Sequence, residues 1–207
     1  MGRNQMTTGR MEAFSDGVIA ILITVMVLEL PRPHGTTWAA LGPAVPVLLT
    51  YLMSFAYLGI YWNNHHHMLQ ATARVSGLIL WANLHLLFWL SLVPFTTAWL
   101  GENQFAATPA AGYGVVLLAA ALAYYGLQTA IIRDQGSRSV VAAAVGRDVK
   151  GKLSPLLYVA GIGLSFANRW AAVAIYASVA IMWIIPDRRL ERKISSAADN
   201  GEYQARE

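Results

Sequence analysis

The sequence predicts an all-α integral membrane protein, and three observations carry that prediction. Hydrophobic residues make up 56% of the 207 residues, the mean hydropathy is +0.45, and charged residues are only 13%. A soluble domain carries roughly 25% charged residues, so this chain has too few charges to cover a water-soluble surface. A soluble enzyme and a disordered chain are therefore excluded. The chain has no cysteine, which excludes disulfides, thiolate metal sites and Cys nucleophiles.

The first predicted span covers residues 12–30 and contains an acid near its start. Its uncharged part, residues 17–28, is too short to cross a bilayer alone, because a spanning helix needs about 20 mostly apolar residues. The span must therefore include Phe14-Ser15-Asp16, which puts Asp16 at or inside the membrane boundary. A secretory signal peptide is the alternative, and it is disfavoured because no small-x-small cleavage site follows.

Five further spans follow from the uncharged runs. Long runs at 35–64, 75–101 and 103–132 predict spans at 43–65, 75–99 and 109–132. Two shorter runs on either side of Arg169 predict a tight hairpin of spans at 153–168 and 170–186. The runs are uniformly apolar instead of alternating, which favours helices over a barrel. Residues 1–186 are thus predicted to form one six-helix transmembrane domain.

The basic residues predict the orientation. Six spans put both termini on one side, and if that side is the cytoplasm only Arg32 and Arg169 lie outside. The cytoplasmic basic residues are then Arg3, Arg10, Arg74, Arg133, Arg138, Arg147, Lys150, Lys152, Arg188, Arg189, Arg192, Lys193 and Arg206. This asymmetry is the positive-inside pattern, so the pI near 9.5 needs no nucleic-acid partner. Residues 187–207 are predicted to be a polar cytoplasmic tail whose basic start suits anionic lipids.

No catalytic motif is present, so we expect neither an enzyme nor a cofactor. The sequence contains no H-E-x-x-H, Walker loop or G-x-S-x-G pattern. His65-His66-His67 suggests a metal site, but adjacent helical residues point about 100° apart and cannot converge on one ion. No Asp or Glu lies nearby in the sequence to complete such a site. We therefore expect these histidines to cap the second span or to bond to neighbouring helices, and we expect no resident metal.

One tripeptide resembles a known filter without its context. Gly112-Tyr113-Gly114 echoes the T-V-G-Y-G filter of tetrameric potassium channels. That filter follows a short pore helix and uses the preceding Thr and Val, whereas Ala110 and Ala111 precede the tripeptide here. The match is interpreted as coincidence, and the tripeptide is predicted to open an ordinary spanning helix.

The first span carries the most informative pattern. An ionisable residue inside a span is costly and marks a functional or structural centre, which singles out Asp16. Beyond it, Ile21, Val25 and Leu28 follow at helical spacing and form one stripe, flanked by Thr24. Packing against a neighbouring helix is the ordinary explanation of such a stripe, and periodicity alone favours it.

Three segments of the sequence resemble one family of channels. They are Arg10-Met11-Glu12-Ala13-Phe14-Ser15-Asp16, the end of the second span Trp62-Asn63-Asn64-His65-His66, and the third span's Trp81-Ala82-Asn83-Leu84 with Pro94-Phe95-Thr96-Thr97. They are similar to the R-x-x-x-F-S-D, W-x-x-H-H, W-x-N-L and P-F-x-T stretches of the endolysosomal potassium channel family (transmembrane protein 175). The resemblance covers roughly residues 10–100.

The resemblance implies a homotetramer in which the first helices line a central pore. The family's isoleucine constriction falls on Ile21, its next two layers on Val25 and Leu28, and its threonine layer on Thr24. Val25 is smaller than the leucine common at that layer. Four isoleucine side chains around an axis would form a dry neck, and a narrow apolar neck gates by dewetting.

The remaining motif residues are interpreted as supports of the pore helix. Ser15 and Asp16 are expected at the wet cytoplasmic mouth, and Arg10 is expected to pair with a group on a neighbouring helix. The residues expected to orient the pore helix by packing, without binding ions, are Arg10, Phe14, Asp16, Trp62, His65, His66, Trp81 and Asn83.

The leading functional prediction is a potassium-selective or weakly selective cation channel in the bacterial cytoplasmic membrane. Its expected partners are other copies of the chain, membrane lipids and monovalent cations, with K⁺ as the permeant ion and no nucleic acid. Two alternatives stay open. The first is a proton leak or proton-coupled transporter, suggested by Asp16, Glu29 and the histidines. The second is a non-conducting membrane scaffold.

Overall fold

The computed structural model describes residues 7–136, 139–145 and 149–184, and within these ranges all regular structure is helical. The elements in chain order are α1 (Thr8–Leu28), the 3₁₀ helix η1 (Trp38–Ala44), α2 (Val45–Gln70), α3 (Gly77–Ser91), α4 (Val93–Glu102), α5 (Ala107–Gln135), α6 (Val140–Val145), α7 (Val149–Ser165) and α8 (Arg169–Ile184). The predicted all-α class is confirmed.

Four helical segments of the described chain are long and apolar enough to cross a membrane. They are Thr8–Leu28, Trp38–Gln70, Gly77–Glu102 and Ala107–Gln135. The last two helices fall where the hairpin is predicted, but α7 has 17 residues and α8 is a shorter apolar helix. The count of six crossings therefore stays a prediction, and the tail at 187–207 lies outside the described residues.

The third predicted span, 75–99, is not one continuous helix. It is divided into α3 and α4 at Leu92, immediately before α4 begins with Pro94 in its first turn. Proline lacks the N–H that an uninterrupted helix would donate four residues back, and its ring clashes with that carbonyl. The same residue is tolerated in the first turn of a new helix. The chain therefore breaks the helix and restarts it.

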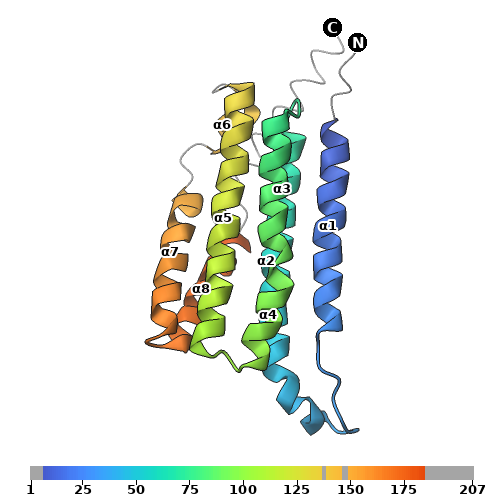
Figure 1. The fold of residues 1–207 in the computed structure, drawn as a ribbon, viewed down its shortest axis with the longest axis vertical. Coiled ribbons are helices and arrows are strands. Elements are labelled where there is room, and N and C mark those ends of the chain that lie inside the picture. The colour runs from blue at the N-terminus through green and yellow to red at the C-terminus, as the bar shows by residue number, and fades with distance from the viewer. Residues whose placement is uncertain (1–6, 137–138, 146–148, 185–207) are drawn as a thin grey trace.

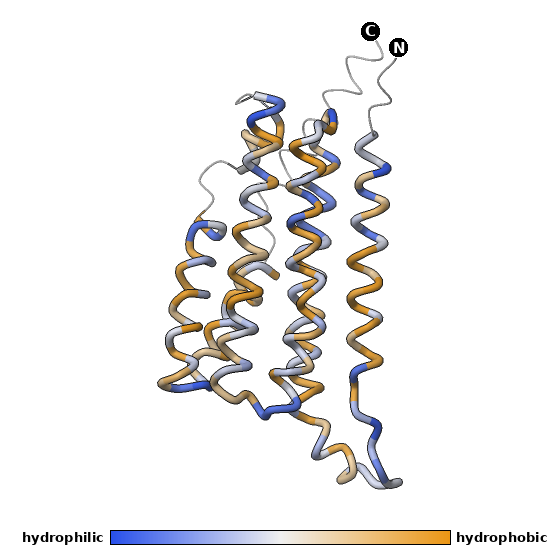
Figure 2. Tube along the Cα trace, viewed as in Figure 1, coloured by the Kyte–Doolittle hydropathy of each residue, from blue (hydrophilic) through white to orange (hydrophobic). Residues whose placement is uncertain are grey.

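The helices run side by side along the long axis of the molecule, with α1 at one edge and α7 and α8 at the other (Figure 1). α1 packs against α2, α3 and α4, and α5 packs against α3, α4, α7 and α8. Hydrophobic residues occupy the middle of the helices, and hydrophilic ones gather at the ends and connecting loops (Figure 2). Such banding is what a bilayer demands of a spanning bundle.

The segment that follows α2 contacts both the start of α1 and the end of α5. Thr8 Oγ1 donates to the carbonyl of Thr72 at 3.2 Å, and Arg74 Nε pairs with Asp134 Oδ2 at 2.9 Å. Arg10 and Arg133 lie on the same terminal turns. Arg32 and Arg169 instead follow α1 and open α8. Arg10, Arg74 and Arg133 thus lie at the end of the bundle where α1 begins, and the cytoplasmic orientation of that end stays a prediction.

Two apolar cores hold the bundle. One is rich in aliphatic side chains and joins α1, α2, α3 and α5. The other joins α2, α5, α7 and α8 around Tyr57, Tyr113, Tyr158 and Tyr176. On α5, a Cβ added at Gly112 would meet Trp99 of α4, and one added at Gly114 would meet Tyr176 of the second core. The Gly-Tyr-Gly tripeptide therefore serves close packing inside α5, and no pore loop precedes it.

Candidate functional site: the first helix and its anchor

α1 presents two different faces. Its buried residues recur at helical spacing and pack against the other helices of the chain: Met11, Ser15, Ile19, Leu22 and Met26. The opposite side is also apolar, but it is exposed in the single chain. A helix that turns one side to water normally carries charged residues on that side. The middle of α1 carries none.

The predicted stripe lies on this exposed side. Ile21 is 61% exposed, Val25 37% and Leu28 81%. Thr24 is exposed as well, and its hydroxyl donates to the carbonyl of Ile21 at 2.9 Å. The stripe therefore stays partly or mostly uncovered by the rest of the chain, so packing against the helices of the same chain does not fully explain it.

A buried chain of hydrogen bonds fixes the inner face of α1. Ser15 Oγ donates to the carbonyl of Met11 at 2.9 Å, and Asn83 Nδ2 on α3 donates to Ser15 Oγ at 2.9 Å. Asn83 Oδ1 lies 2.7 Å from His65 Nε2 on α2. All three polar side chains are fully buried. This series of hydrogen bonds through Ser15, Asn83 and His65 is called the anchor of α1 below. It ties three helices together at one buried point, where water cannot replace the bonds.

The donors in this chain are fixed by chemistry. Asn83 Oδ1 has no hydrogen to give, so His65 Nε2 must carry the proton and donate it. Asn83 then uses its amide nitrogen for Ser15, and both ends of the amide are engaged. An alanine at Asn83 would leave His65 without this acceptor, and an unmade buried hydrogen bond costs about 1–3 kcal/mol.

A second group of polar side chains joins α1 to the last turns of α2. His66 Nδ1 lies 2.7 Å from Glu12 Oε1, and ligand atoms of Glu12, Asp16 and His66 lie within 4.8 Å of one another. The expectation that no carboxylate accompanies the histidines was wrong. Glu12 and Asp16 are far from His66 in the sequence, but their spacing of four puts them on one helical face that the fold brings to α2.

The residues predicted to orient α1 do not all take part in the anchor or in the group of Glu12, Asp16 and His66. Among the described residues, His65 and Asn83 are buried, and Asp16 and His66 are half-buried. Phe14, Trp62 and Trp81 are exposed at 55%, 44% and 73%. Arg10 is also exposed, and no ion pair joins it to the described residues of its own subunit. These four side chains are largely exposed, although the Trp62 ring stacks on His66 with centroids 5.8 Å apart. Their predicted role in orienting α1 stays a prediction.

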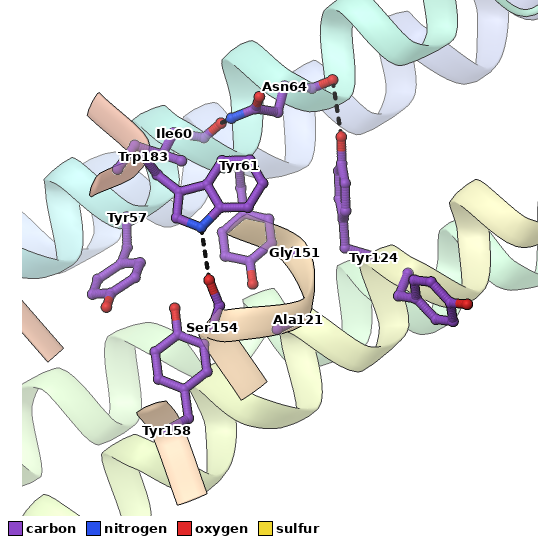
Figure 3. Close-up of a pocket in the computed structure, with 11 residues that line it drawn as sticks. Tyr57, Ile60, Tyr61, Asn64, Ala121, Tyr124, Gly151, Ser154, Tyr158 and Trp183 are labelled. Carbon is purple, nitrogen blue, oxygen red and sulfur yellow. Dashed lines mark hydrogen bonds between the residues drawn. The ribbon is translucent and has the colours of Figure 1, made fainter. Parts of the chain in front are cut away.

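One cavity among the described residues lies away from α1. It has a volume of about 50 Å³ and is lined from α2, α5, α7 and α8 (Figure 3). Trp183 Nε1 donates to Ser154 Oγ at 2.9 Å, and the Tyr124 hydroxyl donates to the carbonyl of Asn64 at 3.2 Å. Since these lining groups bond to one another, the cavity presents a mostly aromatic wall and no row of carbonyls or charges for an ion.

The fold and the first helix define a multi-pass helical membrane protein with an anchored inner face and an apolar outer stripe on α1. A family model described as "Endosomal/lysosomal potassium channel TMEM175" matches residues 10–94. This range contains the stripe and the anchor. The chain belongs to the TMEM175 family. The family consists of ion channels and not of enzymes, in agreement with the absence of a catalytic motif.

Relatives are similar over most of the chain. A potassium channel of Chryseobacterium sp. (strain P1-3) is 51% identical over 189 residues, which cover 91% of this chain and 98% of the relative. The crystal structure of a lysosomal potassium-selective channel TMEM175 homolog from Chamaesiphon minutus superposes with a TM-score of 0.74 at 32% identity, covering 86% of this chain and 96% of that one. The human endosomal/lysosomal proton channel TMEM175 is 40% identical over 86 residues, 34% of this chain and 17% of the human protein.

Proposed function

We propose that the chain is a homotetrameric potassium-selective or weakly selective cation channel whose first helices line the pore. The observation that carries the proposal is the outward stripe of Ile21, Val25 and Leu28 on a helix whose inner face is anchored. A rotation of α1 that buried the stripe would break the Ser15–Asn83 bond. The hydrogen bond therefore keeps the stripe facing outward, away from the other helices of the chain.

The proposed conduction path follows from the chemistry of the stripe. Four copies of Ile21 around an axis form an apolar neck, and Val25 and Leu28 extend it in successive layers. Such a neck excludes water until it widens, so that dewetting gates the flow of ions. Thr24 places a hydroxyl beside the neck, although its proton is directed to the carbonyl of Ile21.

The relatives support two parts of the proposal, K⁺ as the permeant ion and the location in a membrane. The similar bacterial proteins are named potassium channels, at 51%, 34% and 33% identity. We place this chain in a bacterial cytoplasmic membrane with six crossings and both termini inside. The segregation of basic residues supports that orientation by the positive-inside rule. The proposal requires no cofactor.

A second candidate is a proton leak or proton-coupled transport. The observation in its favour is the group of three titratable side chains at the start of α1, Glu12, Asp16 and His66. In addition, the human relative is named a proton channel. A proton can pass through such side chains without a water-filled neck, so this function would not depend on the size of the side chain at position 21.

The test is a flux measurement on liposomes that contain the purified full chain. With a K⁺ gradient, Ile21→Asn is expected to raise K⁺ flux and to lower the preference for K⁺ over Na⁺, because a polar ring stays wet. Ile181→Asn is the matched control. Ile181 on α8 is exposed to 60%, almost the same as Ile21, but it lies on a helix outside the proposed pore. The control should leave selectivity unchanged.

Two outcomes contradict the proposal. If Ile21→Asn and Ile21→Trp both conduct as the unmodified chain does, Ile21 does not form the neck. If a pH gradient drives flux while a K⁺ gradient drives none, the chain carries protons. Liposomes that conduct neither ion under any gradient would point to a non-conducting scaffold.

A further inference from the structure

We propose that Glu12, Asp16 and His66 form a binding site for a divalent transition-metal ion of the Zn²⁺ type, which links α1 to α2. Two carboxylates and one imidazole are the donor types that such ions take in proteins. The three ligand atoms come from two helices and already lie within 4.8 Å of one another. The carboxylates also balance the charge of a divalent cation.

The distances fit an ion after small side-chain rotations. Zinc lies about 2.1 Å from nitrogen and oxygen ligands, so ligands in tetrahedral positions are about 3.4 Å apart. His66 Nδ1 and Glu12 Oε1, now 2.7 Å apart, must separate slightly. No separation in the group exceeds 4.8 Å, so none has to shorten by more than about 1.4 Å to reach that spacing. Both adjustments are within the reach of a Glu or Asp side-chain torsion, and the helices need not move.

Two of the three ligand groups carry a buried atom without an aligned hydrogen bond, and the contact of His66 Nδ1 with Glu12 lies within the site itself. Asp16 Oδ1 and His66 Nδ1 are inaccessible to solvent and have no hydrogen-bond partner among the described residues. The contact of His66 with Glu12 is short but is not aligned as a hydrogen bond. Buried polar atoms are costly when unsatisfied. A cation between them would satisfy both, which distinguishes this group from a solvated cluster of surface acids.

The surroundings of His66 suit a metal ligand. Its other ring nitrogen, Nε2, lies 2.9 Å from the Gln70 side-chain amide, and its ring stacks on Trp62 with centroids 5.8 Å apart. Metal-bound histidines usually donate their second N–H to an oxygen that orients the ring. A half-turn of the Gln70 amide puts its oxygen at this position. Gln70 is therefore a positioning residue of the site.

The position on α1 gives the ion a mechanical consequence, which rests on the proposed function. Asp16 precedes Ile21 by five residues, little more than one helical turn. An ion shared by Glu12, Asp16 and His66 cross-links the start of α1 to α2 and restricts its tilt. Widening of the neck requires such a movement, so the bound metal is expected to reduce flux.

Binding is tested without any measurement of transport. The purified full-length protein in detergent is titrated with Zn²⁺ in competition with a fluorescent chelator. We expect one saturable site per chain, with the Kd raised at least ten-fold in His66→Gln and in Glu12→Gln. His67→Gln is the matched control, because it removes the adjacent histidine, which is not a member of the group. Gln70→Ala is expected to weaken binding by about ten-fold, the usual effect of losing an orienting partner.

The outcomes are decisive in either direction. Unchanged binding in both His66→Gln and Glu12→Gln, or an equal loss in His67→Gln, would overturn the site. The absence of any saturable Zn²⁺ binding by the folded protein would overturn it as well. Thermal melting of each variant without metal verifies that the helices are intact.

A second arm separates the site from the channel. In liposomes, Zn²⁺ is expected to lower K⁺ flux of the unmodified chain and of His67→Gln at concentrations at least ten-fold below those that affect His66→Gln. Equal inhibition of His66→Gln would show that the metal acts elsewhere. If Zn²⁺ binds as expected but no variant conducts K⁺, the site stands and the proposed function fails.

Discussion

The first helix and the fifth are both long and apolar, but they are held by opposite means. α5 is buried by α3, α4, α7 and α8, and its glycines let aromatic side chains approach its backbone. α1 is covered along one face only and is fixed there by a short polar chain through Ser15. The contrast shows that shape complementarity holds a central helix, whereas an edge helix needs a directional anchor that also sets its rotation.

The largest effect on stability is expected where α5 is packed most closely. Tyr176 lies against Gly114 on α5 and Gly161 on α7, and its hydroxyl donates to the carbonyl of Ala110 at 3.2 Å. Gly114→Ala would place a methyl group against the Tyr176 ring, 2.7 Å from Cζ. Overpacking of this kind costs about 3 kcal/mol. For a chain of this length that lowers the melting temperature by about 6–12 °C.

The control for this prediction lies in the same helix. A Cβ at Gly126 would meet nothing within 4 Å. Gly126→Ala is therefore expected to be neutral or to stabilise α5 by up to about 1 kcal/mol, since alanine favours helix over glycine. Equal losses in both variants would mean that steric fit does not distinguish α5.

The anchor of α1 is expected to give the next largest effect. Asn83→Ala removes the acceptor of His65 and the donor to Ser15, at a cost of about 2 kcal/mol. Thermal melting should show this loss, while Asn63→Ala, an exposed position on α2, should melt like the unmodified protein. A stable Asn83→Ala variant with unchanged flux would mean that the anchor does not set the orientation of α1.

A smaller effect on the subunit is expected at the outward aromatic residues. Trp81 is 73% exposed, so Trp81→Ala removes few contacts inside the chain. If this face meets another copy, the variant should lose tetramer in cross-linking or size-exclusion measurements while its secondary structure is unchanged. Leu122→Ala on α5, 54% exposed, is the control. Intact tetramers in Trp81→Ala would place the interface elsewhere.

The smallest effect is expected at the end of the bundle. Arg74 pairs with Asp134 at 2.9 Å and also donates to the Asp134 carbonyl at 2.7 Å, but its side chain is 65% exposed. Exposed ion pairs contribute about 0.2–1 kcal/mol. Arg74→Ala should therefore shift thermal melting slightly, and high salt should reduce the difference further. A loss as large as that of Gly114→Ala would contradict the proposed contrast between packing and surface charge.

The sequence predicts the positions of the helices well, because uncharged apolar runs admit few other structures in a membrane. It does not predict their details. The division at Leu92 depends on whether Pro94 bends a helix or starts a new one, and Pro94 itself was the available signal. α2 continues to Gln70 instead of ending near residue 65, since polar histidines do not stop a helix.

The candidate site was predictable only where the residues lie in one segment. The stripe on α1 follows from helical spacing, and the resemblance of the motifs points to His65 and Asn83. The approach of Glu12 to His66 does not follow, because it depends on how α1 and α2 are aligned along their length. The four-residue spacing of Glu12 and Asp16 predicts only that the two carboxylates share one face of a helix, and it does not predict that this face meets His66.

The anchor also sets an order of events during synthesis. Ser15 leaves the ribosome long before Asn83, the residue that donates to it. Until α3 has been made, α1 has its contacts with α2 but lacks the buried hydrogen bond that fixes its rotation about its own axis. The pairing of α1 with a second copy before that moment would use a helix with undefined orientation. Completion of the first three helices is therefore the earliest point in translation at which the outward face exists as a defined surface.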